Sequence, residues 1–142
     1  MNQLISLLHE GNYSCVIQNG ADVRTFTRRG VIDVYELLHH DAAFLRGASL
    51  ADKVIGKGAA ALMIQGGVAK VYAGVISQSA LALFQAHNVQ VDYKLCVAGI
   101  QNRDQTGGCP LEQICAVSDS VSELMPLITG FILAMRQRCN PA

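Results

Sequence analysis

The sequence predicts an α/β domain in which helices cover both faces of a mixed sheet, in three layers. Three observations predict this class. Asn19-Gly20 separates two short strand-like runs and is a strong signal for a β-hairpin. Residues 68–77, VAKVYAGVIS, alternate at first and then become continuously apolar, which is typical of a central strand covered on both faces. Segments with the apolar spacing of helices lie between the strand-like runs.

Each element is predicted from the spacing of its apolar residues and from the residues that end it. Apolar residues three or four positions apart indicate a helix, and alternation indicates a strand. Glycine, Asn-Gly and proline mark most of the boundaries. The predicted elements are a helix over 2–10, strands over 13–18 and 23–27, a helix over 31–40, a helical turn within 41–48, a helix over 49–67, a strand over 68–77, a helix over 77–87, a strand from 89 to about 100, a loop over 102–108, and helices over 110–115 and about 118–138.

Length and composition limit the classes of protein to which the chain can belong. Its 142 residues predict one domain, covering 1–142. The net charge is zero, so no basic surface for nucleic acid is expected, and no apolar run reaches the roughly 18 residues of a membrane span. Five cysteines with no pattern of pairs favour a reducing cytoplasm over a disulfide framework. We therefore expect a cytoplasmic protein with no nucleic-acid and no membrane partner, and its assembly into a homo-oligomer stays open.

Residues 49–67, SLADKVIGKGAAALMIQGG, are predicted to form the central helix. Ser49, followed by Asp52 three residues later, has the form of a capping box. The run AAALMI at 59–64 is apolar on every side, as expected of a helix that is buried in a core. We expect the rest of the chain to pack around this helix.

Four residues near the start of this predicted helix are unfavourable there. Lys53 and Lys57 are one helical turn apart, where like charges repel, and they crowd the positive end of the helix dipole. Gly56 and Gly58 each cost about 1 kcal/mol relative to alanine in a helix interior. One interpretation is an electropositive pocket in which the backbone approaches an anion closely. The alternative is that the lysines reach into solvent and the glycines let another element pack closely.

A second group of polar residues lies before and within the predicted helix over 110–115. Cys109 lies just before the helix start at Pro110, where the thiol pKa is lowered, and Arg103 nearby would lower it further. Glu112 suits the first turn of the helix and could act as an acid or base, and Asn102 precedes Arg103. The alternative is structural: a small buried cysteine, a capping glutamate and an arginine paired with it.

Several common motifs are absent. The chain has no GxxxxGK[ST] phosphate loop, no HExxH and no GxSxG. Residues 56–61 match G-x-G-x-x-A, but only 53–55 could form the strand before it, and no acid occurs over 53–91, so we interpret the match as chance. The four histidines, at positions 9, 39, 40 and 87, have no cysteine at metal-ligand spacing. No metal and no cofactor are therefore expected.

Short motifs in a fixed order relate the chain to a known family. They are Ser14-Cys15, Arg29-Gly30, Asp52-Lys53, Gly56-Lys57, Ile76-Ser77, Ile100, Asn102-Arg103, Cys109-Pro110 and Glu112. In these residues, from about position 10 to 115, the chain resembles a small prokaryotic family described as a domain of unknown function, whose fold belongs to the cytidine deaminase-like superfamily. The resemblance implies a three-layer α/β/α fold with a mixed five-stranded sheet.

The chain departs from true deaminases at the metal site. Deaminases of that superfamily begin the central helix with His-x-Glu or Cys-x-Glu and the next helix with Pro-Cys-x-x-Cys. Here the corresponding predicted helices begin with Asp52-Lys53 and with 77–80, SQSA. The resemblance therefore implies a pocket without zinc chemistry, lined instead by Lys53, Lys57 and Ser77. Such a pocket suits a phosphate, a carboxylate or a nucleotide-like ligand.

Two hypotheses about function follow. In the first, the protein is a metal-independent enzyme acting on a small anionic or nucleotide-like molecule, and charged residues at two helix starts favour it. In the alternative, the protein is a non-catalytic module that binds or senses such a ligand in the same pocket. The expected catalytic residues are Lys57 as electrophile or nucleophile, Cys109 as nucleophile and Glu112 as acid/base, and the expected ligand-binding residues are Asp52, Lys53, Gly56, Ser77, Asn102 and Arg103.

Overall fold

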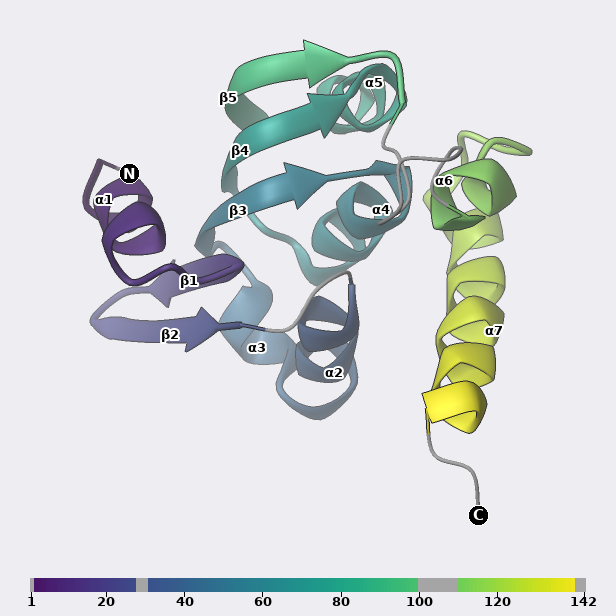
Figure 1. Ribbon diagram of the computed structural model, residues 1–142, viewed down its shortest axis with the longest axis horizontal. Helices are drawn as coiled ribbons and strands as arrows, with labels where there is room; N and C mark the ends of the chain where they lie inside the picture. The colour runs from purple at the N-terminus through teal and green to yellow at the C-terminus, as the bar shows by residue number, and fades with distance from the viewer. Residues whose placement is uncertain (1, 28–30, 100–109, 140–142) are drawn as a thin grey trace.

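A mixed five-stranded sheet forms the centre of the molecule (Figure 1). The computed structural model describes residues 2–27, 31–99 and 110–139. Antiparallel pairing joins the first three strands in the spatial order β2-β1-β3, and parallel pairing continues the sheet to β4 and β5. The strands are β1 (Cys15–Asn19), β2 (Asp22–Phe26), β3 (Ser49–Ile55), β4 (Lys70–Ser77) and β5 (Gln90–Val97).

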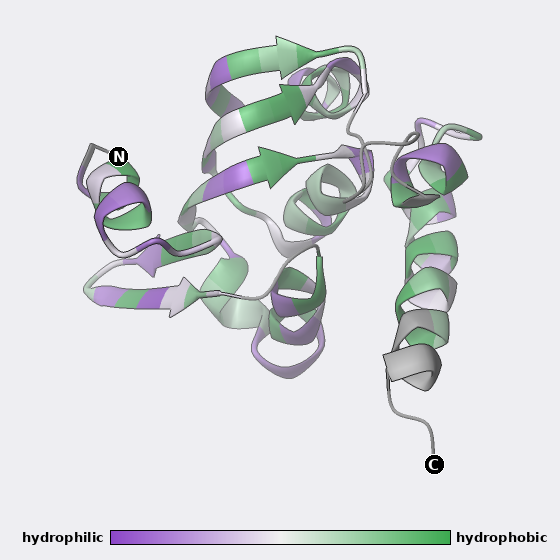
Figure 2. Ribbon diagram, in the orientation of Figure 1, coloured by the Kyte–Doolittle hydropathy of each residue, from purple (hydrophilic) through white to green (hydrophobic). Residues whose placement is uncertain are grey.

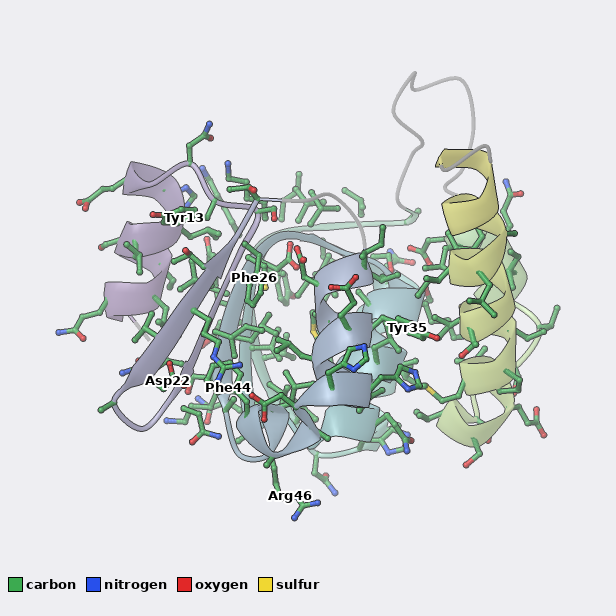
Figure 3. All side chains as sticks on the ribbon, turned by 90° about the horizontal axis from the view of Figure 1, so that it is seen from below. Tyr13, Asp22, Phe26, Tyr35, Phe44 and Arg46 are labelled. Carbon is green, nitrogen blue, oxygen red and sulfur yellow. The ribbon has the colours of Figure 1, made fainter. Side chains whose placement is uncertain are left out.

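Helices lie on both faces of this sheet. Viewed from below, α1 with Tyr13 just after it lies on one side, and α2 with Tyr35 lies on the other (Figure 3). Helices α6 and α7 pack on the outer side of α4. The helices are α1 (Asn2–Glu10), α2 (Ile32–His40), α3 (Ala42–Leu45), α4 (Lys57–Gly66), α5 (Gln78–Ala86), α6 (Pro110–Cys115) and α7 (Val121–Cys139).

The main core lies between the sheet and helices α2 to α5, with α4 at its centre. Residues 59–63 of α4 are all buried, as predicted for the run AAALMI. Leu124, Ile128 and Ile132 of α7 are fully buried and four residues apart, so α7 covers α4 with one face. Burying each such side chain contributes about 1.5–3 kcal/mol. Figure 2 shows the apolar colouring of α4 and of the described part of α7.

A smaller apolar cluster lies on the opposite face of the sheet. Leu4 and Leu8, one turn apart on α1, pack against Val16 of β1 and Ala51 of β3. The polar residues of α1 lie on its other sides, as Figure 2 shows. In the part of the chain that the structure describes, no helix is both long and apolar enough to cross a membrane.

The prediction of one helix over 49–67 is wrong in its first half. Residues 49–55 form β3, which pairs with β1 on one side and with β4 on the other. This pairing satisfies the backbone of β3, and Val54 and Ile55 are β-branched residues that suit a strand. Asp52 is therefore no part of a capping box, and its carboxylate accepts a hydrogen bond from the Val54 N–H at 3.1 Å instead.

The other described elements follow the predictions closely, with a one-residue shift at the hairpin. Asn19 ends β1, so Gly20 and Ala21 form the turn, and Gly20 has a left-handed φ of 60°. The side-chain amide of Asn19 instead donates to the carbonyl oxygens of Phe44 (2.8 Å) and Arg46 (3.0 Å). Asn19 therefore ties the hairpin to α3. The predicted loop over 102–108 lies outside the described residues.

Candidate functional site

Helices α4 and α5 begin at the carboxyl ends of two adjacent parallel strands, β3 and β4 (Figure 1). Gly56 precedes α4 in an extended conformation, and Ser77 precedes α5. The hydroxyl of Ser77 accepts a hydrogen bond from the Ala80 N–H at 3.2 Å, and Ser77 is fully buried. The topology therefore brings Lys57 and Ser77 to the carboxyl ends of the strands, where α/β sheets usually bind ligands.

Lys57 is a buried cation at the start of α4. Only 4% of its surface is exposed. Its ammonium group donates to the carbonyl oxygen of Ser118 at 2.6 Å and to Oδ1 of Asp119 at 2.8 Å, in the turn between α6 and α7. The side chain of Asp119 is 94% exposed, so the ion pair lies at the boundary between core and solvent. The hydrogen bond from Lys57, and then its charge, lower the pKa of the Asp119 carboxyl.

Glu112 brings a carboxylate to the same place from α6. Its Oε2 accepts hydrogen bonds from the backbone N–H of Lys57 (3.3 Å) and from the hydroxyl of Ser79 (3.1 Å). Ser79 Oγ in turn lies 3.2 Å from Ser77 Oγ. One chain of hydrogen bonds thus links the starts of α4, α5 and α6. A carboxylate at a helix start also interacts favourably with the helix dipole.

The two glycines make room for α6. A Cβ atom on Gly58 would lie 2.5 Å from Cδ2 of Leu111, and one on Gly56 would lie 3.3 Å from Cγ of Glu112. The first distance is too short for any side chain at position 58 unless the Leu111 side chain, or α6 with it, shifts. The alternative interpretation, in which the glycines let another element pack closely, therefore applies to both positions.

The structure separates the remaining described site residues from this group. Lys53 and Lys57 do not share a helical turn, because Lys53 is in β3, where its ammonium donates to Asn12 Oδ1 at 2.9 Å on the exposed side. The expected pocket therefore lacks Lys53 in the described structure. Asp52 also lies within the sheet. Asn102, Arg103 and Cys109 lie outside the described residues.

Hydrogen bonds join Lys57, Ser77, Ser79, Glu112, Ser118 and Asp119 into one group, which we call the Lys57 group. The sequence did not point to three of these residues, Ser79, Ser118 and Asp119. Ser79 follows the capping residue by two positions, which is a weak signal for a polar helix start. Ser118 and Asp119 lie in a run of short polar residues before α7, which indicates only a turn. Ser118 and Asp119 lie 61 and 62 positions after Lys57 in the sequence.

A second polar site lies at Asp52, which is half-buried and pairs with Cys15 of β1. Burial raises the pKa of Asp52 to about 7, although hydrogen bonds from the Val54 backbone and Cys15 act in the other direction. Burial, followed by the charges of Asp52 and Asp33, raises the pKa of Cys15 well above its usual value. Cys15 is therefore a thiol rather than a reactive thiolate.

Neither of two surface hollows coincides with the Lys57 group. One of about 430 Å³ lies along α1, and another of about 290 Å³ lies between β2 and α2, beside Arg24, Phe26 and Asp33. Among the residues whose side chains the structure describes, no three histidine, cysteine or acidic residues are grouped so that they could hold a metal ion.

The comparisons with known proteins agree with this fold. A model of the family described as "TM1506: Domain of unknown function (DUF1893)" matches residues 3–132. The crystal structure of the DUF1893 family protein TM1506 from Thermotoga maritima has a TM-score of 0.84 and 22% identity, over 91% of this chain and 87% of that chain. The curated proteins contain no match. Since the family model covers most of the chain, the protein belongs to the DUF1893 family.

Proposed function

We propose that this protein binds a small anion, such as the phosphate or carboxylate of a nucleotide-like molecule, where α4 and α5 begin. The observation that carries the proposal is the position of Glu112. Its carboxylate accepts from the Lys57 N–H and from the Ser79 hydroxyl. Donors that hold the carboxylate of the protein itself can hold the oxygens of a ligand when Glu112 moves aside.

Lys57 would supply the positive charge for this ligand. Its ammonium is buried, so it needs an anionic partner at all times. Its present partner, Asp119, is almost entirely exposed, so it can turn into solvent as a ligand oxygen takes its place. A ligand oxygen in place of Asp119 would keep the buried charge of Lys57 paired.

The same ion pair favours binding over catalysis. A nucleophilic lysine needs a free amine, whereas the Lys57 ammonium donates hydrogen bonds to the Asp119 carboxylate and the Ser118 carbonyl. The enzyme hypothesis, with Lys57, Cys109 and Glu112 as reacting groups, remains the second candidate. Its test is covalent labelling of Lys57 by an amine-reactive reagent at neutral pH, which binding alone does not require.

We also propose that the fold is cytidine deaminase-like and that the protein is cytoplasmic. The mixed sheet and the two adjacent helix starts at one sheet edge support the first proposal. Superposition on a cytidine deaminase, with all five strands matched in order and direction, tests it. Cys15 and Cys96 form no disulfide within the described residues, which supports a reducing compartment, and cell fractionation tests that.

Thermal melting with inorganic phosphate and AMP tests the binding proposal. We expect both to raise the Tm of the wild type in a concentration-dependent way, relative to chloride at equal ionic strength. Lys57→Met should abolish this shift. Lys53→Met is the matched control. Lys53 is close to Lys57 in the sequence, but its ammonium binds Asn12 away from the proposed site. This variant should therefore keep the rise in Tm. Circular dichroism establishes that each variant is folded.

Glu112→Gln and Ser79→Ala make the test sharper. Glu112→Gln removes the internal anion that competes for the site, so it should strengthen phosphate binding, whereas Ser79→Ala removes a donor and should weaken it. An absence of stabilisation by phosphate and AMP in both the wild type and Glu112→Gln would contradict the proposal. Equal losses in Lys57→Met and Lys53→Met would contradict the assigned site.

A further inference from the structure

β5 forms one edge of the sheet. β5 is the last strand of the sheet, and among the described residues no other strand pairs with its outer side (Figure 1). Its eight residues include four consecutive exposed ones, 92–95, and Tyr93 and Leu95 are 44% and 54% exposed. A long edge strand with exposed apolar side chains is a template for pairing with another strand.

The opposite edge of the sheet is protected by comparison. β2 has five residues, and Arg24 at its centre binds Asp41 (2.9 Å) and Asp22 (3.1 Å). The guanidinium also lies 3.9 Å from the centre of the Phe44 ring. Charged side chains engaged in this way discourage pairing along an edge. The two edges of one sheet thus differ, and β5 is the one suited to a partner.

We infer that β5 pairs antiparallel with β5 of a second copy of this chain, around a twofold axis at Tyr93. In this register Asp92 lies opposite the partner's Lys94, and Lys94 lies opposite the partner's Asp92. Val91 lies opposite the partner's Leu95 in the same way. Each charged pair and each apolar pair is complementary, as a self-complementary twofold interface requires.

The charge pattern also selects this register over its neighbours. A twofold axis at Asp92 would place two aspartates directly opposite each other, and an axis at Lys94 would do the same with two lysines. Like charges that face each other across two strands are unfavourable. Only the register centred on Tyr93 pairs opposite charges on both sides of the axis. The pairing joins two five-stranded sheets into one continuous sheet, and it does not depend on anion binding at Lys57.

Charge reversal tests this dimer. Analytical ultracentrifugation of the wild type, from micromolar to near-millimolar concentration, should show a monomer–dimer equilibrium. Asp92→Lys and Lys94→Asp each place like charges opposite one another twice, so each should weaken the dimer at least about tenfold. The double variant Asp92→Lys/Lys94→Asp restores opposite pairs and should restore the dimer, which also shows that the strand still folds.

Glu10→Lys is the matched control, since it reverses one charge on exposed α1 and leaves β5 unchanged. It should dimerise like the wild type. A wild type that stays monomeric at near-millimolar concentration overturns the inference. So does a double variant that stays monomeric while folded, or a control that dissociates as the single β5 variants do. The inference is also overturned if the wild type stays monomeric and β5 pairs with a different protein instead.

Discussion

At the residue scale, Asp52 shows how burial changes the chemistry of one side chain. It lies in β3 opposite Cys15, with Asp33 of α2 buried nearby. The loss of water outweighs the hydrogen bonds that favour the charged form, so the pKa rises to about 7. Near neutral pH, this carboxyl is therefore partly protonated within the sheet.

The raised pKa of Asp52 predicts a fall in stability as the pH rises. The folded protein holds a proton on Asp52 that the unfolded chain, with a pKa near 3.8, releases. This contribution to stability is therefore fully present below pH 3.8 and is lost as the pH rises through about 7. Asp52→Asn keeps the acceptor for Val54 and never ionises, so it should remove this slope and stabilise the protein above pH 7 by up to about 4 kcal/mol.

Urea unfolding at several pH values measures this effect. Glu10→Gln, a neutralised carboxyl on exposed α1, is the control and should keep the wild-type slope. If the stability of Asp52→Asn depends on pH just as that of the wild type does, the protonated carboxyl of Asp52 is not the source of the slope.

At the element scale, the approach of α6 to the first turn of α4 depends on a missing side chain. Gly58 is in α4, where alanine would be favoured by about 1 kcal/mol on helix propensity alone. The buried side chain of Leu111 occupies the space in which a Cβ would lie. Packing between the helices therefore decides the residue at this position, and it also holds Glu112 beside Lys57.

Gly58→Ala should destabilise the protein by about 1 kcal/mol net, since overpacking a core costs about 1–3 kcal/mol and exceeds the propensity gain. Gly130→Ala in α7 is the matched control, because a Cβ there meets nothing within 4 Å. It should stabilise the protein by up to about 1 kcal/mol. Denaturant midpoints measure both changes.

A double-mutant cycle identifies Leu111 as the cause. In the Leu111→Ala background, Gly58→Ala should become neutral or stabilising, because the shortened side chain leaves room for the Cβ. Equal destabilisation by Gly58→Ala in both backgrounds would show that Leu111 is not the obstacle.

At the scale of the whole molecule, the C-terminal part of the chain completes the core. α7 buries Leu124, Ile128 and Ile132 against the outer side of α4, and the turn before it supplies both partners of the Lys57 ammonium. The central helix is therefore enclosed by the sheet on one side and by a distant segment of the chain on the other. Loss of this segment would expose apolar surface along α4.

Ile128→Ala should cost about 2–5 kcal/mol, because it opens a cavity between α7 and α4. Leu127, its neighbour in sequence, is exposed, and Leu127→Ala should change stability by no more than about 0.5 kcal/mol. Thermal and urea unfolding measure the difference. Similar effects of the two substitutions would mean that α7 does not pack through Ile128.

Much of the fold could be predicted from the sequence because its signals are local. Apolar spacing within ten or so residues predicts α1, α2 and α5, and Pro110 at a helix start predicts α6. The Asn-Gly pair predicts the β-hairpin to within one residue. The uniformly apolar run at 59–64 predicts the buried part of α4. Periodicity and turn residues need no knowledge of the partner element, so they can be read along the chain.

Only the tertiary structure decided that 49–55 is a strand. A Ser-x-x-Asp sequence before an alanine-rich run is a helix start by local rules, but β1 and β4 lie on both sides of this segment and pair with its backbone. The same change moves Lys53 away from Lys57. The partners of Lys57 and Ser79 come from α6 and the turn after it, 33 to 62 residues away in the sequence. Local composition does not indicate which distant segments come into contact. The charge of Lys57 is paired only in the folded chain, because its partners come from a distant segment.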